Sequence, residues 1–208
     1  MKTVGRNVSG NNTITVITGL PRSGKSTLLK EKIIPDLLKK GKKVLVVDVN
    51  KEYRPTKNLY VFEITDYNNA EAEVEALLGT LLNNKGLIDV LVIDESNVVF
   101  SKTTLQPNAK RLFNTLRHVK IDAYVVARRP VDINLFLSEN AQKRYVFHAS
   151  GVNDVRRLNE ILQGLGDRAF EFCTSLTSII VDKQNKYYSS VDGILFTKDK
   201  KEIVCYPG

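Results

Sequence analysis

The stretch "TITVITGLPRSGKST", residues 13–27, runs from an apolar segment through a glycine-rich turn into a polar segment. Residues 19–27 satisfy the pattern G-x-x-x-x-G-K-[ST]. The flanking residues predict a strand before the turn and a helix after it, which is the context this pattern requires. The glycines let the backbone fold around an anion, so that successive N–H groups and the helix N-terminus face it. The turn therefore predicts a phosphate-binding loop in a nucleotide-binding α/β fold.

This loop supplies the expected ligands of ATP and Mg²⁺, the cofactors that the sequence predicts. Lys25 would place its charge at the β- and γ-phosphate oxygens, and the Ser26 hydroxyl would coordinate Mg²⁺. The nucleotide-binding residues are expected to be Gly19, Leu20, Pro21, Arg22, Ser23, Gly24, Lys25, Ser26 and Thr27.

A second polar site follows the apolar run "IDVLVIDES", residues 88–96. Ligands of open α/β sheets bind at the carboxyl ends of the strands, where Asp94 and Glu95 would lie. Asp94 fits a carboxylate that binds Mg²⁺ directly or through water, and Glu95 fits the base that orients an attacking water. Together with the loop, this pair predicts ATP hydrolysis, with Lys25 and Glu95 as catalytic residues.

Apolar runs rich in Val and Ile alternate with segments of helical period along the chain. Continuous apolar strands separated by helices indicate an α/β fold with a mostly parallel sheet covered by helices on both faces. The tail from residue 186 predicts a hairpin or small meander at a sheet edge. We expect one domain over residues 1–208, with a core at 13–165 and a β-rich edge at 166–208. Strands are predicted at 13–18, 43–49, 58–64, 88–94, 121–127 and 143–149, and helices at about 25–39, 69–82, 108–119 and 153–162.

A chain of 208 residues, 42% of them apolar, is long enough to bury one substantial core. No apolar run reaches the roughly 18 residues of a membrane span, and the first residues lack a signal-peptide core, so we expect a soluble intracellular protein. The net charge of +8 comes mainly from residues 1–50, with 10 basic and 3 acidic side chains, and 101–150, with 9 and 3. The second block is the better candidate for a surface that binds a polyanion. Cys173 and Cys205 are expected to be reduced thiols.

Two other P-loop classes, GTPases and small-molecule or nucleotide kinases, compare less well with the sequence. A GTPase needs an Asn-Lys-x-Asp guanine reader, and the Asn-Lys pairs at 50–51 and 84–85 lack the Asp. A small-molecule or nucleotide kinase remains open, since Arg128, Arg129 and Arg144 could clamp a second phosphate. A kinase must exclude water, however, and a Glu beside the Asp favours hydrolysis.

The chain resembles the FtsK/HerA superfamily of DNA-pumping ATPases, in the compact form of the genome-packaging ATPases of tectivirus-like viruses. The resemblance covers roughly residues 13–165 and is carried by "GLPRSGKST", "VLVVDVNKEY", "VLVIDES", "LRHVKIDAYVVARRPVDI" and "KRYVFHASGVNDVRRL". It implies a RecA-like P-loop NTPase of the ASCE class that moves double-stranded DNA into a capsid as a homo-oligomeric ring, most often a hexamer. It also implies capsid or membrane-embedded portal proteins as partners, in the host cytoplasm or at a packaging vertex of the virion. A morphogenesis or export ATPase of the same fold is a further alternative.

The resemblance also assigns roles to residues outside the loop. Arg117 matches the helix arginine that family members direct into a neighbouring subunit's nucleotide site. Asp48 and Glu52 match an acidic pair after the second strand, of which Asp48 is expected near the phosphates. Where the family has a Gln that senses the γ-phosphate, this chain has Arg128.

The run "AYVVARRP", residues 123–130, is predicted to be a central strand beside the strand that leads to Asp94. Pro130 biases Arg129 toward an extended conformation and ends the strand. Strand alternation would send Arg128 and Arg129 to opposite sides of the sheet. We expect Arg128 to replace the Gln as a catalytic sensor of the γ-phosphate. Arg129 is expected to make a structural ion pair or to contact a neighbouring subunit.

Overall fold

The computed structural model describes residues 12–147, 153–154, 156–157, 188–192, 194–201 and 203–205. The chain divides into two compact units, Met1–Arg157 and Leu158–Gly208. A single domain over residues 1–208, with a core at 13–165 and a β-rich edge at 166–208, stays a prediction.

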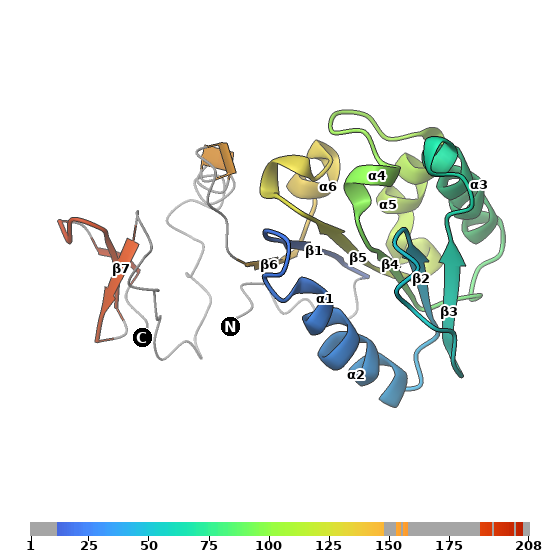
Figure 1. The fold of residues 1–208 in the computed structure, drawn as a ribbon, viewed down its shortest axis with the longest axis horizontal. Coiled ribbons are helices and arrows are strands. Elements are labelled where there is room, and N and C mark those ends of the chain that lie inside the picture. The colour runs from blue at the N-terminus through green and yellow to red at the C-terminus, as the bar shows by residue number, and fades with distance from the viewer. Residues whose placement is uncertain are drawn as a thin grey trace. The chain divides into compact units, whose positions relative to one another are not determined.

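The first unit is built on a sheet of six strands in the order β3-β2-β4-β5-β1-β6 (Figure 1). Every neighbouring pair in this sheet is parallel. β5 therefore lies between β1, which leads into the phosphate-binding loop, and β4, which leads to Asp94. The strands are β1 (Ile14–Thr18), β2 (Val44–Asp48), β3 (Leu59–Glu63), β4 (Val90–Ile93), β5 (Asp122–Ala127) and β6 (Lys143–Val146).

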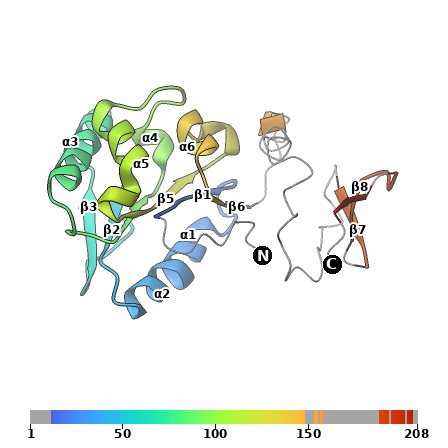
Figure 2. The same ribbon diagram turned by 180° about the vertical axis from the view of Figure 1, so that it is seen from behind.

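Alternate residues of the central strands enter two apolar cores, one on each face of the sheet. In β4, for example, Leu91 and Ile93 belong to the larger core, whereas Val90 and Val92 belong to the smaller one. The larger core is covered by α3 (Ala70–Asn83), α5 (Pro107–Val119) and α6 (Leu135–Glu139). The helix that follows the phosphate-binding loop covers the smaller core on the opposite face (Figures 1 and 2). The predicted α/β architecture is thus confirmed.

The helix after the loop contains a wide turn in its middle. It consists of α1 (Lys25–Leu28), a π-helical segment η1 (Leu29–Ile33) and α2 (Ile34–Lys39). Within the π turn, the Ile34 N–H donates to the Leu29 carbonyl. Pro35 has no N–H, and its ring would clash with the Glu31 carbonyl in a regular α-helix, which accounts for the wider turn. The predicted helix at 25–39 is confirmed, although its π turn was not predicted.

The remaining elements compare closely with the predictions. The six predicted strands and the helices at 69–82 and 108–119 correspond to β1–β6, α3 and α5. The short helices α4 (Ser96–Val99) and α6, and the 3-10 turns η2 (Tyr67–Asn69) and η3 (Pro130–Asp132), were not predicted, because such short elements leave no periodic pattern. The helix predicted at 153–162 is helical at residues 153, 154, 156 and 157, and the rest of it lies outside the described residues, as do residues 148–149.

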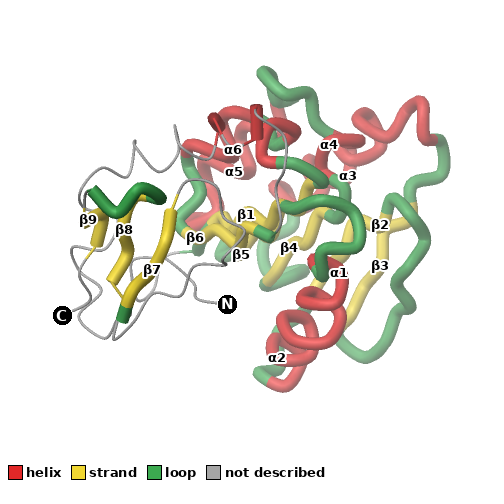
Figure 3. Tube along the Cα trace, turned by 60° about the vertical axis from the view of Figure 1, so that its left-hand side comes forward, coloured by secondary structure: helices red, strands yellow, loops and turns green. Residues whose placement is uncertain are grey.

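The second unit contains an antiparallel sheet of three strands, β7 (Tyr188–Val191), β8 (Ile194–Thr197) and β9 (Ile203–Cys205), shown in yellow in Figure 3. Within the described residues these strands pair with one another and with no strand of the parallel sheet. The expected C-terminal hairpin or meander is therefore present. No helix in the described ranges has the length and apolarity needed to cross a membrane.

Candidate nucleotide site

The phosphate-binding loop connects β1 to α1 and depends on both of its glycines. Gly24 caps α1 with φ 100° and ψ 8°, a left-handed conformation that glycine adopts without strain, and its carbonyl accepts the Leu28 N–H at 2.9 Å. A Cβ at Gly19 would overlap the Cβ of Phe147 and lie 2.8 Å from the Ser23 Oγ. The end of β6 therefore packs against the loop, and no side chain fits at Gly19.

Lys25 connects the loop to the carboxylates of the neighbouring strand. Its side chain is buried, and Nζ donates to the carbonyls of Gly19 at 2.6 Å and Leu20 at 3.0 Å. Burial lowers the pKa of the Lys25 ammonium, while the negative charges of Glu95 and Asp94 act in the opposite direction. The two motifs expected to bind nucleotide and metal thus interact electrostatically.

Three polar residues end neighbouring strands at the carboxyl edge of the sheet. Asp48 closes β2, Asp94 follows β4 and Arg128 follows β5. In each strand the residue two positions earlier is a valine of the smaller core, which lies under the phosphate-binding helix. Because side chains alternate with a period of two, all three polar residues start toward this same face.

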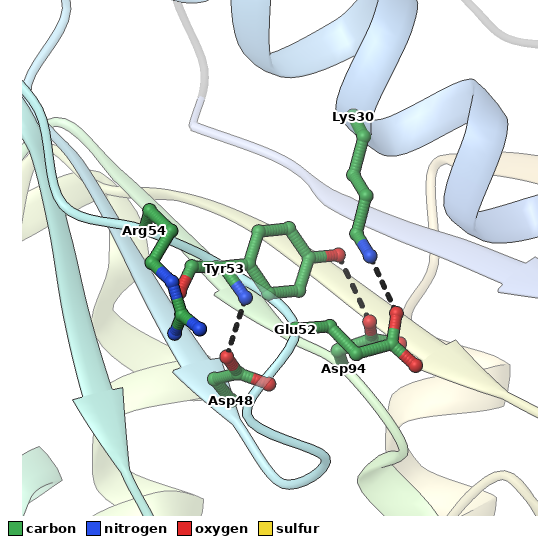
Figure 4. Close-up of polar contacts among 6 residues, drawn as sticks. All are labelled: Lys30, Asp48, Glu52, Tyr53, Arg54 and Asp94. Carbon is green, nitrogen blue, oxygen red and sulfur yellow. Dashed lines mark hydrogen bonds and ion pairs between the residues drawn. The ribbon is translucent and has the colours of Figure 1, made fainter.

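Asp94, the candidate Mg²⁺ ligand, is 6% exposed and accepts a hydrogen bond from the Tyr53 hydroxyl at 2.9 Å (Figure 4). Burial raises the pKa of Asp94, the hydrogen bond from Tyr53 opposes this shift, and the charges of Glu95 and Glu52 add to it. Burial and the Asp94 charge also raise the pKa of Tyr53, so its hydroxyl stays protonated and donates. Asp94 is therefore a buried carboxylate with a defined neutral partner.

Tyr53 lies in the loop after β2, and two further contacts hold it there (Figure 4). The Tyr53 N–H donates to Asp48 Oδ2 at 2.8 Å. Lys30 Nζ, from the π segment η1, lies 4.8 Å from the centroid of the Tyr53 ring and forms an ion pair with Glu52. Asp48 and Glu52 therefore have different tasks here, since Asp48 is buried beneath the loop and Glu52 fastens it to the phosphate-binding helix.

Glu95, the candidate base, has an unusual backbone and a charged partner. Its φ of 59° and ψ of 50° lie in the left-handed region, which costs a non-glycine residue about 1–3 kcal/mol. Arg128 Nε donates to Glu95 Oε2 at 2.8 Å, and the two side chains are 51% and 14% exposed. β5 lies beside β4 as predicted, and it brings Arg128 to the end of the β4 strand.

The other two arginines considered at this edge have partners in the same chain. Arg129 Nε donates to both carboxylate oxygens of the buried Asp154, at 3.2 and 2.9 Å. The structural ion pair predicted for Arg129 is thus confirmed. Arg144 donates to the backbone carbonyls of Ser138 and Ala141, and burial lowers its pKa.

Arg117 lies away from this site. It is exposed near the C-terminal end of α5, which ends at Val119 with Lys120 in a left-handed conformation. β5 then starts at Asp122, which pairs with Val90, the first residue of β4. Arg117 is therefore near the amino edge of the sheet, opposite the phosphate-binding loop of its own chain.

Two residues of the site, Tyr53 and Phe147, were not predicted. In "DVNKEY" the family resemblance rests on the acidic residues, and the signal for Tyr53 is an aromatic residue in an otherwise polar loop. Phe147 follows β6, its N–H donates to the Thr18 carbonyl at 2.8 Å, and it packs against the glycines of the phosphate-binding loop. No local pattern in the sequence reveals that contact.

The donor set fits a metal that arrives with the nucleotide. A serine hydroxyl, at Ser26, and a carboxylate, at Asp94, are the hard oxygen ligands that Mg²⁺ prefers. Over the described ranges, no three His, Cys, Asp or Glu side chains gather into a metal site. Mg²⁺ commonly binds through one or two protein groups, with phosphates and water completing its shell.

Comparisons with solved structures agree with this fold. The chain is similar to B204, the DNA-packaging ATPase of Sulfolobus turreted icosahedral virus, with 21% identity, a TM-score of 0.66 and coverage of 93% of this chain and 96% of that one. It is also similar to the genome-packaging NTPase B204 of Sulfolobus turreted icosahedral virus 2 in complex with ATP-gammaS, with 20% identity, a TM-score of 0.64 and coverage of 92% and 95%.

A more distant likeness is to the cytoplasmic domain of the type VII secretion ATPase EccC of Thermomonospora curvata. The identity is 13%, the TM-score is 0.51, and the match covers 67% of this chain and 20% of that one. No protein-family model and no curated protein sequence matches the chain. The α/β P-loop NTPase fold implied by the resemblance is therefore confirmed by the likeness in structure.

Proposed function

We propose that this protein is an ATPase that moves double-stranded DNA, and that it packages a viral genome into a capsid. One observation carries the proposal: the strand β5 brings Arg128 to Glu95, between the phosphate-binding loop and the strand that leads to Asp94. The likeness in fold to a viral DNA-packaging ATPase over nearly the full length of both chains supports it.

In the proposed mechanism, each group at the carboxyl edge has a separate task. The loop amides and Lys25 bind the β- and γ-phosphates, while Glu95 orients the attacking water and accepts its proton. Arg128 engages only Oε2 of Glu95, and release of this bond would free the whole carboxylate for water and leave Arg128 available to the γ-phosphate. Bound Mg²⁺, held by Ser26 and Asp94, would offset the phosphate charge.

The proposed assembly is a homo-oligomeric ring, with six subunits as the expected number. Arg117 is exposed and lies at the sheet edge opposite its own loop, which supports a role in the nucleotide site of a neighbouring subunit. α5 contains no acidic residue and also exposes Lys110 and Arg111, a charge distribution suited to DNA phosphates. Capsid or membrane-embedded portal proteins are proposed as further partners, in the host cytoplasm or at a packaging vertex of the virion.

A small-molecule kinase, or a morphogenesis or export ATPase of the same fold, is less well supported. The kinase alternative needs arginines that clamp a second phosphate. Arg129 is engaged by the buried Asp154, and Arg144 is engaged by backbone carbonyls. Only Arg128, of the three arginines considered for that task, reaches the carboxylates of the site.

The test of this proposal is the rate of phosphate release with and without double-stranded DNA, measured over a series of salt concentrations. We expect DNA of any sequence to stimulate hydrolysis. DNA binding should weaken steeply with salt, because the basic side chains of the protein displace counterions from the DNA phosphates. Stimulation by a small metabolite that becomes phosphorylated, with no response to DNA, would favour the kinase.

A further inference from the structure

We propose that Tyr53 is a positioning residue for Asp94, whose carboxylate it orients toward the metal of a metal–nucleotide complex. The inference deepens the proposed function and rests on it. Tyr53 is not a catalytic residue in this proposal, because it acts through Asp94 rather than by touching substrate.

The contact itself is short and buried. The Tyr53 hydroxyl donates to Asp94 Oδ2 at 2.9 Å, and the two residues are 4% and 6% exposed. A hydrogen bond to one oxygen of a buried carboxylate restricts rotation of the carboxylate plane, and so it restricts the direction of the second oxygen. Hydrogen bonds of this kind to metal ligands tune both their orientation and their affinity for the metal.

Tyr53 is held at a cost to stability, which sets it apart from an ordinary core tyrosine. Asp48 is 1% exposed, and one of its oxygens accepts the Tyr53 N–H. Its other oxygen, Oδ1, is buried and has no hydrogen-bond partner among the described residues. Burying a carboxylate oxygen without a partner is unfavourable. Asp48 therefore holds the Tyr53 backbone in place, although its burial lowers the stability of the core.

The same tyrosine is attached to the phosphate-binding helix. Lys30 lies over its ring at 4.8 Å and forms an ion pair with Glu52, the residue before Tyr53. Lys30 belongs to the continuous helix that starts with Lys25 and Ser26. Through the loop after β2, a cation–π contact and an exposed ion pair thus link the carboxylate side of the candidate metal site to the helix that carries its hydroxyl side.

The experiment uses Mn²⁺ as a paramagnetic substitute for Mg²⁺ and needs no turnover. The full chain, saturated with ATPγS, is titrated with Mn²⁺, and free Mn²⁺ is measured by its electron paramagnetic resonance signal. We expect Tyr53→Phe to weaken Mn²⁺ binding by about 10- to 100-fold, the usual effect of removing a hydrogen-bonding partner of a metal ligand. Binding of ATPγS in EDTA should be unchanged, whereas general damage to the fold would weaken it too.

Tyr124→Phe is the matched control. Tyr124 lies on β5 and packs against the same smaller core as Tyr53, and no hydrogen bond ties its hydroxyl to Asp94. It should bind Mn²⁺ as the unaltered protein does. Equal Mn²⁺ affinity in Tyr53→Phe and Tyr124→Phe would overturn the inference and leave the proposed function standing. If the unaltered protein bound neither ATPγS nor Mn²⁺ with it, the proposed function itself would fail, and the inference with it.

Discussion

Asp94 and Glu95 are adjacent in the chain, yet they are held in opposite ways. Asp94 is buried and bonded to a neutral hydroxyl, which is itself fixed by the loop after β2. Glu95 has a left-handed backbone and is bonded to Arg128, a cation that is half exposed. One carboxylate has a permanent partner in the core, while the other has a partner that water can replace.

This difference follows from what each carboxylate must do in the proposed reaction. A group that helps bind a metal ion works best when its direction is fixed before the metal arrives. A group that orients water needs an oxygen that water can reach. The Arg128 side chain is 51% exposed, so water can screen its ion pair with Glu95 and take its place. The structure thus separates a rigid half of the site from an exchangeable half.

The largest expected effect tests whether the site needs a neighbouring subunit. If Arg117 acts in a neighbour's site, the two halves described above are not a complete active site in one chain. Lys25→Ala and Arg117→Ala should each be nearly inactive alone, since a catalytic arginine supplied by a neighbour is worth about 10³- to 10⁵-fold in rate. Mixed together, they should recover part of the hydrolysis rate, because a Lys25→Ala subunit still offers its arginine to a neighbour with an intact loop. No recovery at any mixing ratio would mean that the site lies within one chain.

The next effect compares the two halves directly. Glu95→Gln should bind ATP and turn over about 100-fold more slowly or worse, the scale for one preorganised catalytic group. Its Mn²⁺ binding with ATPγS should be unchanged, whereas Asp94→Asn should lose it. Nucleotide binding, metal binding and phosphate release are measured on both variants. Near-normal phosphate release by Glu95→Gln would remove that residue from the mechanism.

The contrast between the two halves was only partly predictable from the sequence. The shared edge follows from apolar runs that lead into "GKST", "DES" and "ARRP", because the carboxyl ends of parallel strands gather at one edge. The place of β5 beside β4 was also predicted, whereas the rest of the strand order was not. The specific partners were not predictable. Tyr53 meets Asp94 through the conformation of an irregular loop, and the bond from Arg128 to Glu95 depends on side-chain conformations beyond the predicted placement of β5 beside β4. Arg129 likewise pairs with Asp154, 25 residues away. Such contacts depend on tertiary packing, which local patterns do not encode.

A smaller effect tests whether Arg128 belongs to the exchangeable half. Arg128→Ala should keep ATP binding and lose about 10- to 100-fold of the DNA-stimulated rate, as expected for a hydrogen bond to a charged group worth about 1.5–3 kcal/mol. Arg128→Gln, which restores the residue of the resembling family, should retain more activity than Arg128→Ala. Arg129→Ala is the control, because its partner Asp154 lies outside the carboxylate pair, and it should mainly lower stability. A normal rate in Arg128→Ala and none in Arg129→Ala would reverse the two roles.

The smallest effect concerns the stability of the fold. It distinguishes Asp94 from Glu95 by the pH dependence of unfolding, with no nucleotide present. Because burial raises the pKa of Asp94 above its ordinary value, the native state holds a proton that the unfolded state has lost, at pH values between the ordinary pKa and the raised one. Stability contributed by this group therefore falls as pH rises through that window, by about 1.4 kcal/mol for each unit of difference between the two pKa values. Asp94→Asn has no proton to lose, so its stability relative to the unaltered protein should increase as pH rises above about 4.

Urea unfolding of both proteins across a pH series measures this difference. Glu95→Gln is the matched control, because it removes an ion pair with a half-exposed arginine and should change stability by less than about 1 kcal/mol, in the destabilising direction. If the free energy of unfolding rises in Asp94→Asn and not in Glu95→Gln, the buried charge of Asp94 lowers the stability of the fold. If the Asp94→Asn difference stayed constant with pH, the charge of Asp94 would be fully compensated, with Lys25 the nearest candidate, since the two already interact electrostatically.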